Sequence, residues 1–421
     1  MRGNPRVWLL LSLFAFSTAW LYMNRVLVPW EQYFNVDAGT MKAALGDLYS
    51  PWFGTRALLT RRQNPYGAAV THEIQMAFYG HDVVQNADPA IRATDEQRFA
   101  YPVYVSFLLA PVARFDFDTL HAAAPAVLAL ATLAGVWIWI SVMHWRASAM
   151  TAAAIAVFVL ASPQAMQGLR LRQIGLLVTA LLALSVFLIV RHRLAMAGVV
   201  LAICTIKPQM IVLPLAWLLM WSLGDLRKRW PFPVGFVVTV GLLVSAGELI
   251  LPGWIRDFLH GLSAYRTYGP VTTWLQLAIG NHAGKALAVI LIVGLFALGW
   301  TNRQCAAGSP EFILTLSTFL VVATIALPLL PPFNQVLLTL PVLVLLRDWG
   351  TLPKYGRIAF AACVAWPWMA SFVLLIGHPQ LKSLRPLPLL PSALVLIFPI
   401  LLTLLLMLRR SQIRLTERVD A

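Results

Sequence analysis

The chain has 421 residues, of which 59% are hydrophobic and only 12% are charged, and its formal net charge is 32 − 17 = +15. A soluble domain carries about twice that share of charged residues, so the composition excludes a soluble enzyme, a disordered chain and a secreted disulfide scaffold. Bilayer lipid accommodates this many apolar side chains, and the length suffices for roughly ten or more helical spans of about 20 residues each.

The first apolar run covers residues 7–30 and follows Arg2 and Arg6. It is longer than the apolar part of a typical signal peptide, and no small-x-small cleavage site follows it. Arg25 interrupts the run near its far end, where a long side chain can reach the headgroups. We therefore expect a retained first span with a cytoplasmic N-terminus rather than a cleaved signal peptide.

The one long polar segment covers residues 31–100 and contains eight acidic and six basic residues. Its charge is therefore −2, and the rest of the chain carries 15 + 2 = +17. Basic residues elsewhere occur in short clusters between apolar runs, which is typical of cytoplasmic loops and not of nucleic acid binding. The polar segment is accordingly expected to be a long first extracytoplasmic loop with short amphipathic helices.

Twelve further apolar runs follow, and several are shorter than the roughly 20 residues that a full span needs. We interpret 101–114 as a segment that dips into the membrane and returns, with a full crossing as the alternative. The first run and the other eleven then give twelve crossings in a single integral-membrane domain, residues 1–421, with both termini cytoplasmic. The prediction is an all-α polytopic membrane protein, a bundle of about 11–13 transmembrane helices. The twelve runs are 101–114, 119–143, 149–166, 174–190, 194–206, 208–222, 231–251, 284–301, 312–328, 334–347, 357–376 and 388–408.

Lys207 and Pro208 separate runs 194–206 and 208–222, each of which is too short to span the bilayer comfortably. Broken helices are tolerated in membranes where they line a polar cavity. A phosphate would be a natural partner for a lysine there, because the N-terminus of the following helix adds positive potential. The alternative is a lysine that extends to the interface.

Asp47, Tyr49 and Trp52 lie close together in the polar segment. A carboxylate in such a loop can act as a general base on a hydroxyl, and aromatic rings beside it can stack on a sugar. The alternative is a helix cap at Asp47 followed by an interfacial helix with belt aromatics. Asp37 is the less favoured carboxylate, because no aromatic residue follows it at the same spacing.

Several other polar residues lie at membrane depth or in the expected extracytoplasmic loops. Arg170 and Arg172 indicate an anionic ligand there, unless the topology of their short loop is wrong. Tyr265 and Asn334 either contact a polar ligand or anchor their loops.

Neither a metal site nor an ATP-binding loop is expected. The histidines at 72 and 81 and the acid at 73 lack the spacing of a zinc site, and the three cysteines form no CxxC pair. No Walker-type loop is present, so the sequence does not support ATP-driven transport.

Eight short motifs follow one another along the chain: Asp47-Leu48-Tyr49, Asn64-Pro65-Tyr66-Gly67, Phe99-Ala100-Tyr101-Pro102, Leu109-Ala110-Pro111, Arg172-Gln173, Ile206-Lys207-Pro208-Gln209, Leu251-Pro252-Gly253-Trp254 and Phe333-Asn334-Gln335-Val336-Leu337-Leu338. In order and spacing they resemble glycosyltransferase family 87, bacterial polyprenol-phosphate-sugar enzymes with the multi-spanning GT-C architecture. The sequence departs from the family at Asn64, where Asp is frequent, and at Arg172-Gln173-Ile174-Gly175, where Gly-Gln-x-Asn is common.

The resemblance implies inverting transfer of a sugar, mannose-like or a pentose, from a polyprenyl-phosphate donor to an acceptor hydroxyl. The acceptor would be a glycan or a lipid-linked molecule, and the reaction would take place on the extracytoplasmic face of the bacterial inner membrane. It implies Asp47 as general base and Lys207, Arg172 and Arg170 as ligands of the donor phosphate. The residues that would bind sugar or acceptor are Tyr49, Trp52, Tyr66, Tyr101, Gln173, Gln209, Tyr265 and Asn334.

No cofactor or metal is expected, because fixed cations can hold a leaving monophosphate and the lipid-linked sugar is a substrate. The competing class is a membrane transporter or lipid flippase, which would equally contain broken helices and an intramembrane lysine. The acidic loop at 31–100 favours the transferase, because transport needs no such loop.

Overall fold

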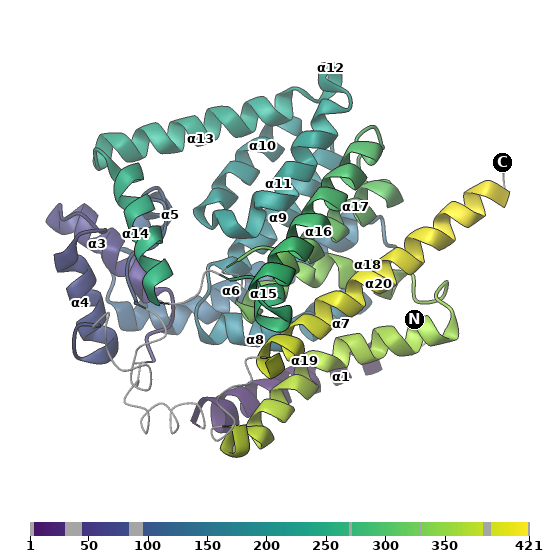
Figure 1. Ribbon diagram of the computed structural model, residues 1–421, viewed down its shortest axis with the longest axis horizontal. Coiled ribbons are helices and arrows are strands. Elements are labelled where there is room, and N and C mark those ends of the chain that lie inside the picture. The colour runs from purple at the N-terminus through teal and green to yellow at the C-terminus, as the bar shows by residue number, and fades with distance from the viewer. Residues whose placement is uncertain are drawn as a thin grey trace.

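A computed structural model describes residues 4–29, 44–83, 96–268, 272–328, 331–381 and 389–419, which form a bundle of helices without a β-strand among them (Figure 1). The protein is an all-α polytopic membrane protein, as the composition predicts. In chain order the elements are α1 Pro5–Tyr22, η1 Met23–Leu27, α3 Tyr49–Arg61, α4 Ala68–Tyr79, α5 Val105–Leu109, η2 Ala110–Val112, α6 Phe117–Val142, α7 Ala149–Leu160, α8 Pro163–Arg170, α9 Gly175–Val190, α10 Leu194–Ile203, η3 Cys204–Ile206, α11 Pro208–Leu223, α12 Leu226–Arg229, α13 Pro231–Ile250, α14 Trp254–Tyr268, α15 Trp274–Ile279, α16 Asn281–Asn302, α17 Pro310–Ala326, η4 Pro332–Leu338, α18 Thr339–Arg347, α19 Lys354–Leu381 and α20 Leu389–Val419.

Within the described residues, six helical segments are long and apolar enough to cross a membrane, and five apolar helical segments are shorter. Helices α7 and α8 meet the same criteria only as a pair, with a bend of 67° between them. Each of the twelve predicted crossings falls on one of these segments. A short member such as α10, with 10 residues, rises only about 15 Å, against a hydrocarbon core of about 30 Å. The six longer segments are Pro5–Leu27, Phe117–Val142, Pro231–Ile250, Asn281–Asn302, Lys354–Val373 and Val395–Ile413.

The bend between α7 and α8 corrects the prediction of one continuous run over 149–166. Ser162 begins α8 as its N-cap, with its hydroxyl accepting from the N–H of Ala165 at 3.3 Å. Pro163 occupies the first position of α8, where its missing N–H costs nothing. This cap and proline start a new helix, so the chain changes direction inside the apolar run.

Residues 101–114 form only the short helices α5 and η2, of five and three residues. A five-residue helix rises about 7.5 Å, so the segment cannot cross the bilayer core, and the alternative of a full crossing is wrong. The hydroxyl of Tyr104, just before α5, donates to Thr205 Oγ1 at 2.9 Å. The segment is thereby held against the end of α10 and η3.

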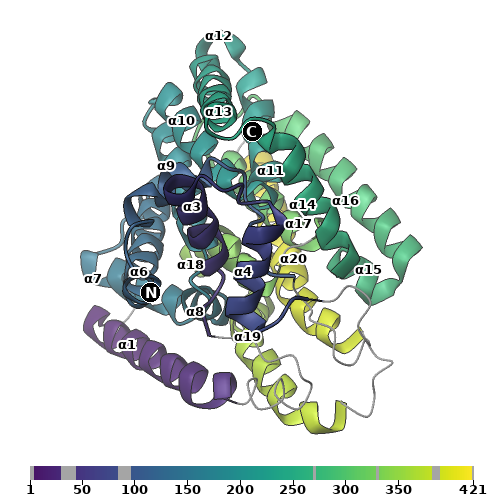
Figure 2. The same cartoon turned by 90° about the vertical axis from the view of Figure 1, so that its left-hand side faces the viewer.

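Helices α3 and α4 lie in the first polar segment and pack on each other through Ala57, Val70, Ile74 and Phe78 (Figure 2). In Figure 1 these two helices lie with α14 at one end of the molecule, and the start of α1 and the end of α20 lie at the opposite end. The polar first segment and the described ends of the chain are therefore separated along the long axis of the bundle.

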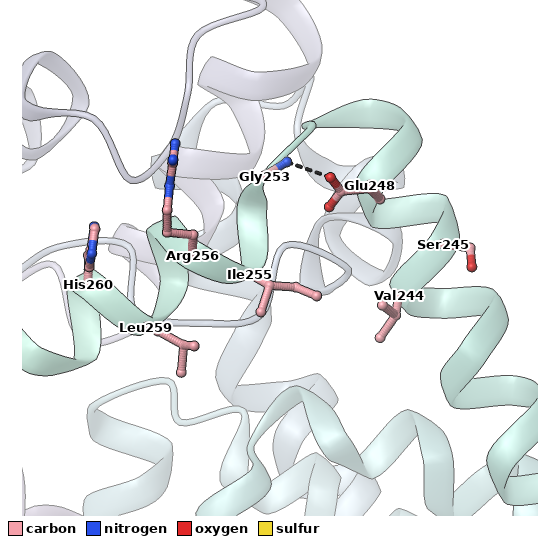
Figure 3. Close-up of a pocket in the computed structure, with 8 residues that line it drawn as sticks. All are labelled: Val244, Ser245, Glu248, Gly253, Ile255, Arg256, Leu259 and His260. Carbon is pink, nitrogen blue, oxygen red and sulfur yellow. Dashed lines mark hydrogen bonds between the residues drawn. The ribbon is translucent and has the colours of Figure 1, made fainter.

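A sharp elbow joins α13 to α14 and brings α14 back beside the first polar segment (Figure 3). Gly253 has φ +79°, a conformation that favours glycine, and its N–H donates to Glu248 Oε1 at 2.6 Å. On α14, Asp257 Oδ2 accepts from Asn64 Nδ2 at 2.7 Å, which ties α14 to the loop after α3. The elbow also forms a pocket of about 650 Å³ lined by Val244, Ser245, Glu248, Gly253, Ile255, Arg256, Leu259 and His260.

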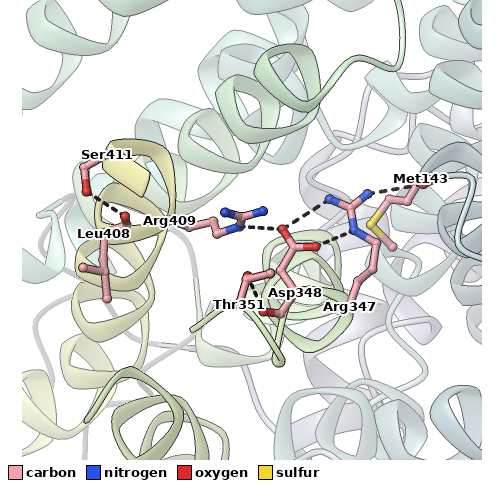
Figure 4. Close-up of polar contacts among 7 residues, drawn as sticks. All are labelled: Met143, Arg347, Asp348, Thr351, Leu408, Arg409 and Ser411. Carbon is pink, nitrogen blue, oxygen red and sulfur yellow. Dashed lines mark hydrogen bonds and ion pairs between the residues drawn. The ribbon is translucent and has the colours of Figure 1, made fainter. Parts of the chain in front are cut away.

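An ion cluster joins the loop after α18 to the last helix (Figure 4). Asp348 accepts from Arg347 Nε at 2.8 Å and from Arg409 Nε at 2.7 Å, and its side chain is 10% exposed. Arg347 also donates to the carbonyl of Met143 at 3.2 Å. Burial alone would raise the pKa of Asp348, but the hydrogen bonds and charges of the two arginines outweigh it and hold that pKa below its ordinary value.

Replacing Asp348 by Asn should lower the free energy of unfolding by roughly 3 kcal/mol, the low end for removing one member of a buried ion pair. Because the folded pKa lies below the unfolded value of about 3.9, the stabilisation is complete above that value and disappears as the pH falls through the folded pKa. The difference in Tm between wild type and variant in nanodiscs should be full at pH 7 and shrink below about pH 4. Asp82→Asn is the matched control, because that side chain is 61% exposed. Equal Tm values for wild type and the Asp348 variant at pH 7 would contradict this account.

Candidate functional site

Lys207 lies at the break between η3 and α11 and is 5% exposed. Pro208 has no N–H and disfavours a helical conformation in the residue before it. Lys207 accordingly has φ −132° and ψ 72°, outside the helical region. The predicted break at this position is confirmed, and the lysine enters the interior where the helix is interrupted.

The ammonium group of Lys207 is held by residues from two other parts of the chain. Its Nζ donates to Gln173 Oε1 at 2.8 Å and to Asn334 Oδ1 at 3.1 Å, and it lies 5.2 Å from the centre of the Phe333 ring. A buried ammonium is costly unless it is hydrogen-bonded, so these contacts permit the burial. A Cβ at Gly175 would lie 3.2 Å from both Nζ and Asn334 Oδ1, so the glycine leaves the room that they need.

Asp47, in the first polar segment, is connected to Lys207 through the side chain of Gln173. Its N–H donates to the carbonyl of Leu171 at 2.7 Å, and its Oδ2 accepts from Gln173 Nε2. The amide of Gln173 therefore bonds Asp47 at one end and Lys207 at the other. We call Asp47, Gln173, Lys207 and Asn334 the Asp47–Lys207 network, which joins a loop carboxylate to a cation in the interior of the bundle.

Arg172 lies beside the network and contacts His121 near the start of α6. Its Nε donates to the His121 carbonyl at 3.4 Å and its Nη2 to His121 Nδ1 at 3.3 Å, while His121 Nε2 donates to the carbonyl of Ala44 at 3.0 Å. The Nη1 group of Arg172 donates to the carbonyl of Arg170. Burial first, and then the charge of Arg170, lowers the pKa of Arg172. The structure thus brings Arg172 next to the segment that carries Asp47.

Tyr49 and Trp52, both predicted to stack on a sugar, belong to an aromatic cluster with Phe53, Phe78 and Phe117. The ring centre of Phe117 lies 4.8 Å from that of Tyr49 and 5.0 Å from that of Trp52. Trp52 is 4% exposed, and its indole N–H donates to the carbonyl of residue 112 at 3.3 Å. Tyr49 is only half-buried, and burial is the main cause that raises its pKa. Of the two rings, Tyr49 is therefore the one that a ligand can reach without displacing neighbours.

The other predicted site residues lie outside the network. The Tyr66 hydroxyl donates to the carbonyl of Tyr101 at 2.7 Å. Gln209 is in the first turn of α11, and no hydrogen bond joins it to the network within the described part of the chain. Tyr265 is on α14, but its side chain falls outside the described residues, as does the whole of Asp37.

Two contributors to the site were not anticipated from the sequence, His121 and Gly175. His121 is a polar residue one turn into an apolar helix, a position that itself indicates a functional or structural role. Gly175 occupies the first position of α9. The need for a residue without a side chain there is visible only once Lys207 and Asn334 are placed around it.

The arrangement combines a group that can accept a proton with cations that can stabilise negative charge. Asp47 is the carboxylate, Lys207 is the cation at the other end of the Gln173 amide, and Arg172 is a second cation beside the segment that carries Asp47. Proton abstraction beside fixed positive charge suits the attack of a hydroxyl with departure of an anion. Across the residues with described positions, no three His, Cys, Asp or Glu side chains are grouped so that they could hold a metal ion.

The sequence model of glycosyltransferase family 87 matches residues 99–328, which is more than half of the chain. The matched region includes Arg170, Arg172, Gln173 and Lys207, whereas Asp47 precedes it and Asn334 follows it. No curated protein and no solved structure gives a significant match to the chain.

Proposed function

The chain belongs to glycosyltransferase family 87 and is a membrane glycosyltransferase, and from this premise we propose that it takes its sugar from a polyprenyl-phosphate donor. The sugar, mannose-like or a pentose, is transferred to an acceptor hydroxyl with inversion. Family membership favours this reaction over the transporter or flippase that the sequence left as the alternative.

The observation that carries the proposal is the Asp47–Lys207 network. Asp47 takes the proton of the acceptor hydroxyl, and the acceptor oxygen forms a bond to the anomeric carbon. The bond from that carbon to the phosphate oxygen breaks, and its electron pair leaves on the polyprenyl phosphate. Lys207 and Arg172 stabilise the charge of that phosphate, with Arg170 beside them, because electrostatic stabilisation acts strongly in a dry interior. Gln173 holds the base and the cation at a fixed separation, because its amide bonds to both.

Contacts around the network suggest where the two substrates lie. Tyr49 supports the acceptor on the side of α3, with Trp52 packed beside it, and Tyr66 and Tyr101 line the approach from the loop. Gln173 and Asn334, which hold Lys207, contact the donor sugar, and Gln209 and Tyr265 stay candidates from the sequence.

The proposed site faces the outside of a bacterial inner membrane, with both termini in the cytoplasm. Support comes from the charge of −2 in residues 31–100 against +17 in the rest of the chain. The arrangement in Figure 1 agrees with this orientation, because α3 and α4 lie opposite the described ends of the chain.

The donor class is tested with the purified full chain in nanodiscs, by offering labelled sugar either on polyprenyl phosphate or on a nucleotide. We expect transfer only from the lipid donor, and we expect it to persist in EDTA, because fixed cations hold the leaving phosphate. Transfer from the nucleotide sugar alone would contradict the proposed donor. Loss of activity in EDTA, restored by a divalent ion, would contradict the role given to Lys207 and Arg172.

A further inference from the structure

A second concave site lies along α3, the helix that begins two residues after Asp47. It is a pocket of about 410 Å³ between α3 and the start of α6. We call it the α3 pocket; its lining residues are Tyr49, Trp52, Phe53, Arg56, Arg61 and Phe117. All six are aromatic residues or arginines, so the pocket combines ring faces with positive charge and has no acidic lining.

Tyr49 is the centre of the aromatic part. Its ring stacks with Phe53 at 5.6 Å between centres and meets Phe117 edge-on at 4.8 Å. Its hydroxyl makes no hydrogen bond within the described residues, and the side chain remains partly exposed. Pockets that bind small molecules typically pair such apolar surfaces with a few polar groups that fix orientation.

The two arginines differ in whether their charge is already neutralised. Arg61 lies 5.1 Å from the centre of the Phe53 ring and forms an ion pair with Glu73 at 2.8 Å. Arg56 lies 5.4 Å from the centre of the Trp52 ring, and its one hydrogen bond is a long contact of 3.5 Å to the carbonyl of residue 115. No carboxylate pairs with Arg56 in the part of the chain that the structure describes. A guanidinium with free N–H groups beside aromatic rings is suited to bidentate binding of a carboxylate or phosphate.

Two paths connect this pocket with the network. Tyr49 lines the pocket and lies two residues after Asp47 in the chain. Phe117 lines it too, and its ring centre is 5.5 Å from that of His121, the partner of Arg172. The pocket is therefore built on the helix that follows Asp47 and on the start of α6, which contacts Arg172.

We propose that the α3 pocket binds the acceptor, and that the acceptor is an anionic saccharide, one whose carboxylate or phosphate pairs with Arg56 while its ring lies against Tyr49. The assignment rests on the proposed function and adds the chemical class of the acceptor. Arg56 supplies the charge and Tyr49 the ring contact. Arg56 is therefore a specificity residue, because it distinguishes an anionic sugar from a neutral one of the same shape.

The test compares methyl glucuronoside, methyl glucoside 6-phosphate and neutral methyl glucoside as ligands of the purified chain in nanodiscs of zwitterionic lipid. Binding is followed calorimetrically, and transfer to each glycoside is measured with the lipid-linked donor. Wild type should bind the two anionic glycosides at least tenfold more tightly than the neutral one, which is the difference in affinity expected from one charge-assisted hydrogen bond. Arg56→Gln should remove that preference and leave binding of the neutral glycoside unchanged, and Arg56→Lys should restore part of it.

Arg62→Gln is the matched control, because it removes a positive charge near the end of the same helix but does not line the pocket. Equal binding of all three glycosides by wild type would overturn the proposal, as would an equal loss for all three in the Arg56 variant. A repeat in nanodiscs with anionic lipid identifies a different occupant: displacement of the glycosides by that lipid would assign the pocket to a headgroup. If the proposed function itself is wrong, the lipid-linked donor is not cleaved in the transfer assay, whichever glycosides bind. That outcome is distinct from a failure of the acceptor assignment.

Discussion

Replacing Asp47 by Asn should lower the rate of sugar transfer by roughly 10²–10⁴-fold, the usual span for loss of a general base. The amide keeps the size of the side chain, and its oxygen can still accept the hydrogen bond from Gln173 Nε2. It cannot take the acceptor's proton, so the chemical step is lost while the network keeps its shape. Donor binding and Tm should stay near those of wild type, because Lys207 retains both of its partners.

The measurement is transfer of labelled sugar from a polyprenyl-phosphate donor by purified variants in nanodiscs, together with donor affinity. Asp82→Asn is the control, an exposed aspartate on the same polar segment that pairs with His72. Asp37→Asn is the rival, since Asp37 is the other aspartate that precedes α3 in the polar segment. Full activity of the Asp47 variant with an inactive Asp37 variant would reassign the base, and full activity of both would remove it from this segment.

Replacing Lys207 by Met should weaken donor binding by roughly 10–100-fold, the effect of losing one charge-assisted contact to phosphate. Met fills similar space without charge, so the protein should still fold, and a Tm measurement checks this. Transfer should fall further than binding, because Gln173 loses the partner that fixes its amide toward Asp47. Lys228→Met is the control, since that lysine is 84% exposed. Unchanged donor affinity and unchanged transfer in the Lys207 variant would show that the lysine takes no part in the reaction.

Gly175→Ala tests the same network without removing any polar group. The added Cβ would lie 3.1 Å from Met210 Sδ and 3.2 Å from Lys207 Nζ, so the neighbours must move by a few tenths of an ångström. We expect a smaller loss of donor affinity in the same direction as for Lys207→Met. This variant changes the position of the ammonium group and leaves its charge in place, so it tests the contribution of position alone.

The six long apolar segments and the break at Lys207 were predictable because they depend on local properties. An apolar run of about 20 residues needs the bilayer, and Pro208 removes a backbone donor and disfavours a helical conformation at Lys207. The bend at Ser162-Pro163 has the same kind of local signal, an N-cap followed by proline at the first helical position, whereas hydropathy alone predicts one continuous run. Hydropathy does not distinguish one straight helix from two that meet at an angle.

The site was predictable in its members but not in its connections. Asp47, Gln173 and Lys207 each stood out as polar residues in unusual places, yet no spacing indicates that one amide joins the other two across 126 and 34 positions of sequence. Trp52 was predicted to stack on a sugar from its neighbourhood in the chain. Phe117, 65 positions later, covers it instead, and tertiary contacts of that kind cannot be obtained from local pattern.

The ion cluster at Asp348 also sets an order of assembly. Arg347 and Asp348 are synthesised together, whereas Arg409 follows 61 residues later. During synthesis the carboxylate therefore has one of its two arginines, and the second comes only with the last helix, α20. A chain that stops before α20 leaves the carboxylate with Arg347 alone, so the contact between Asp348 and Arg409 can form only after α20 has been made.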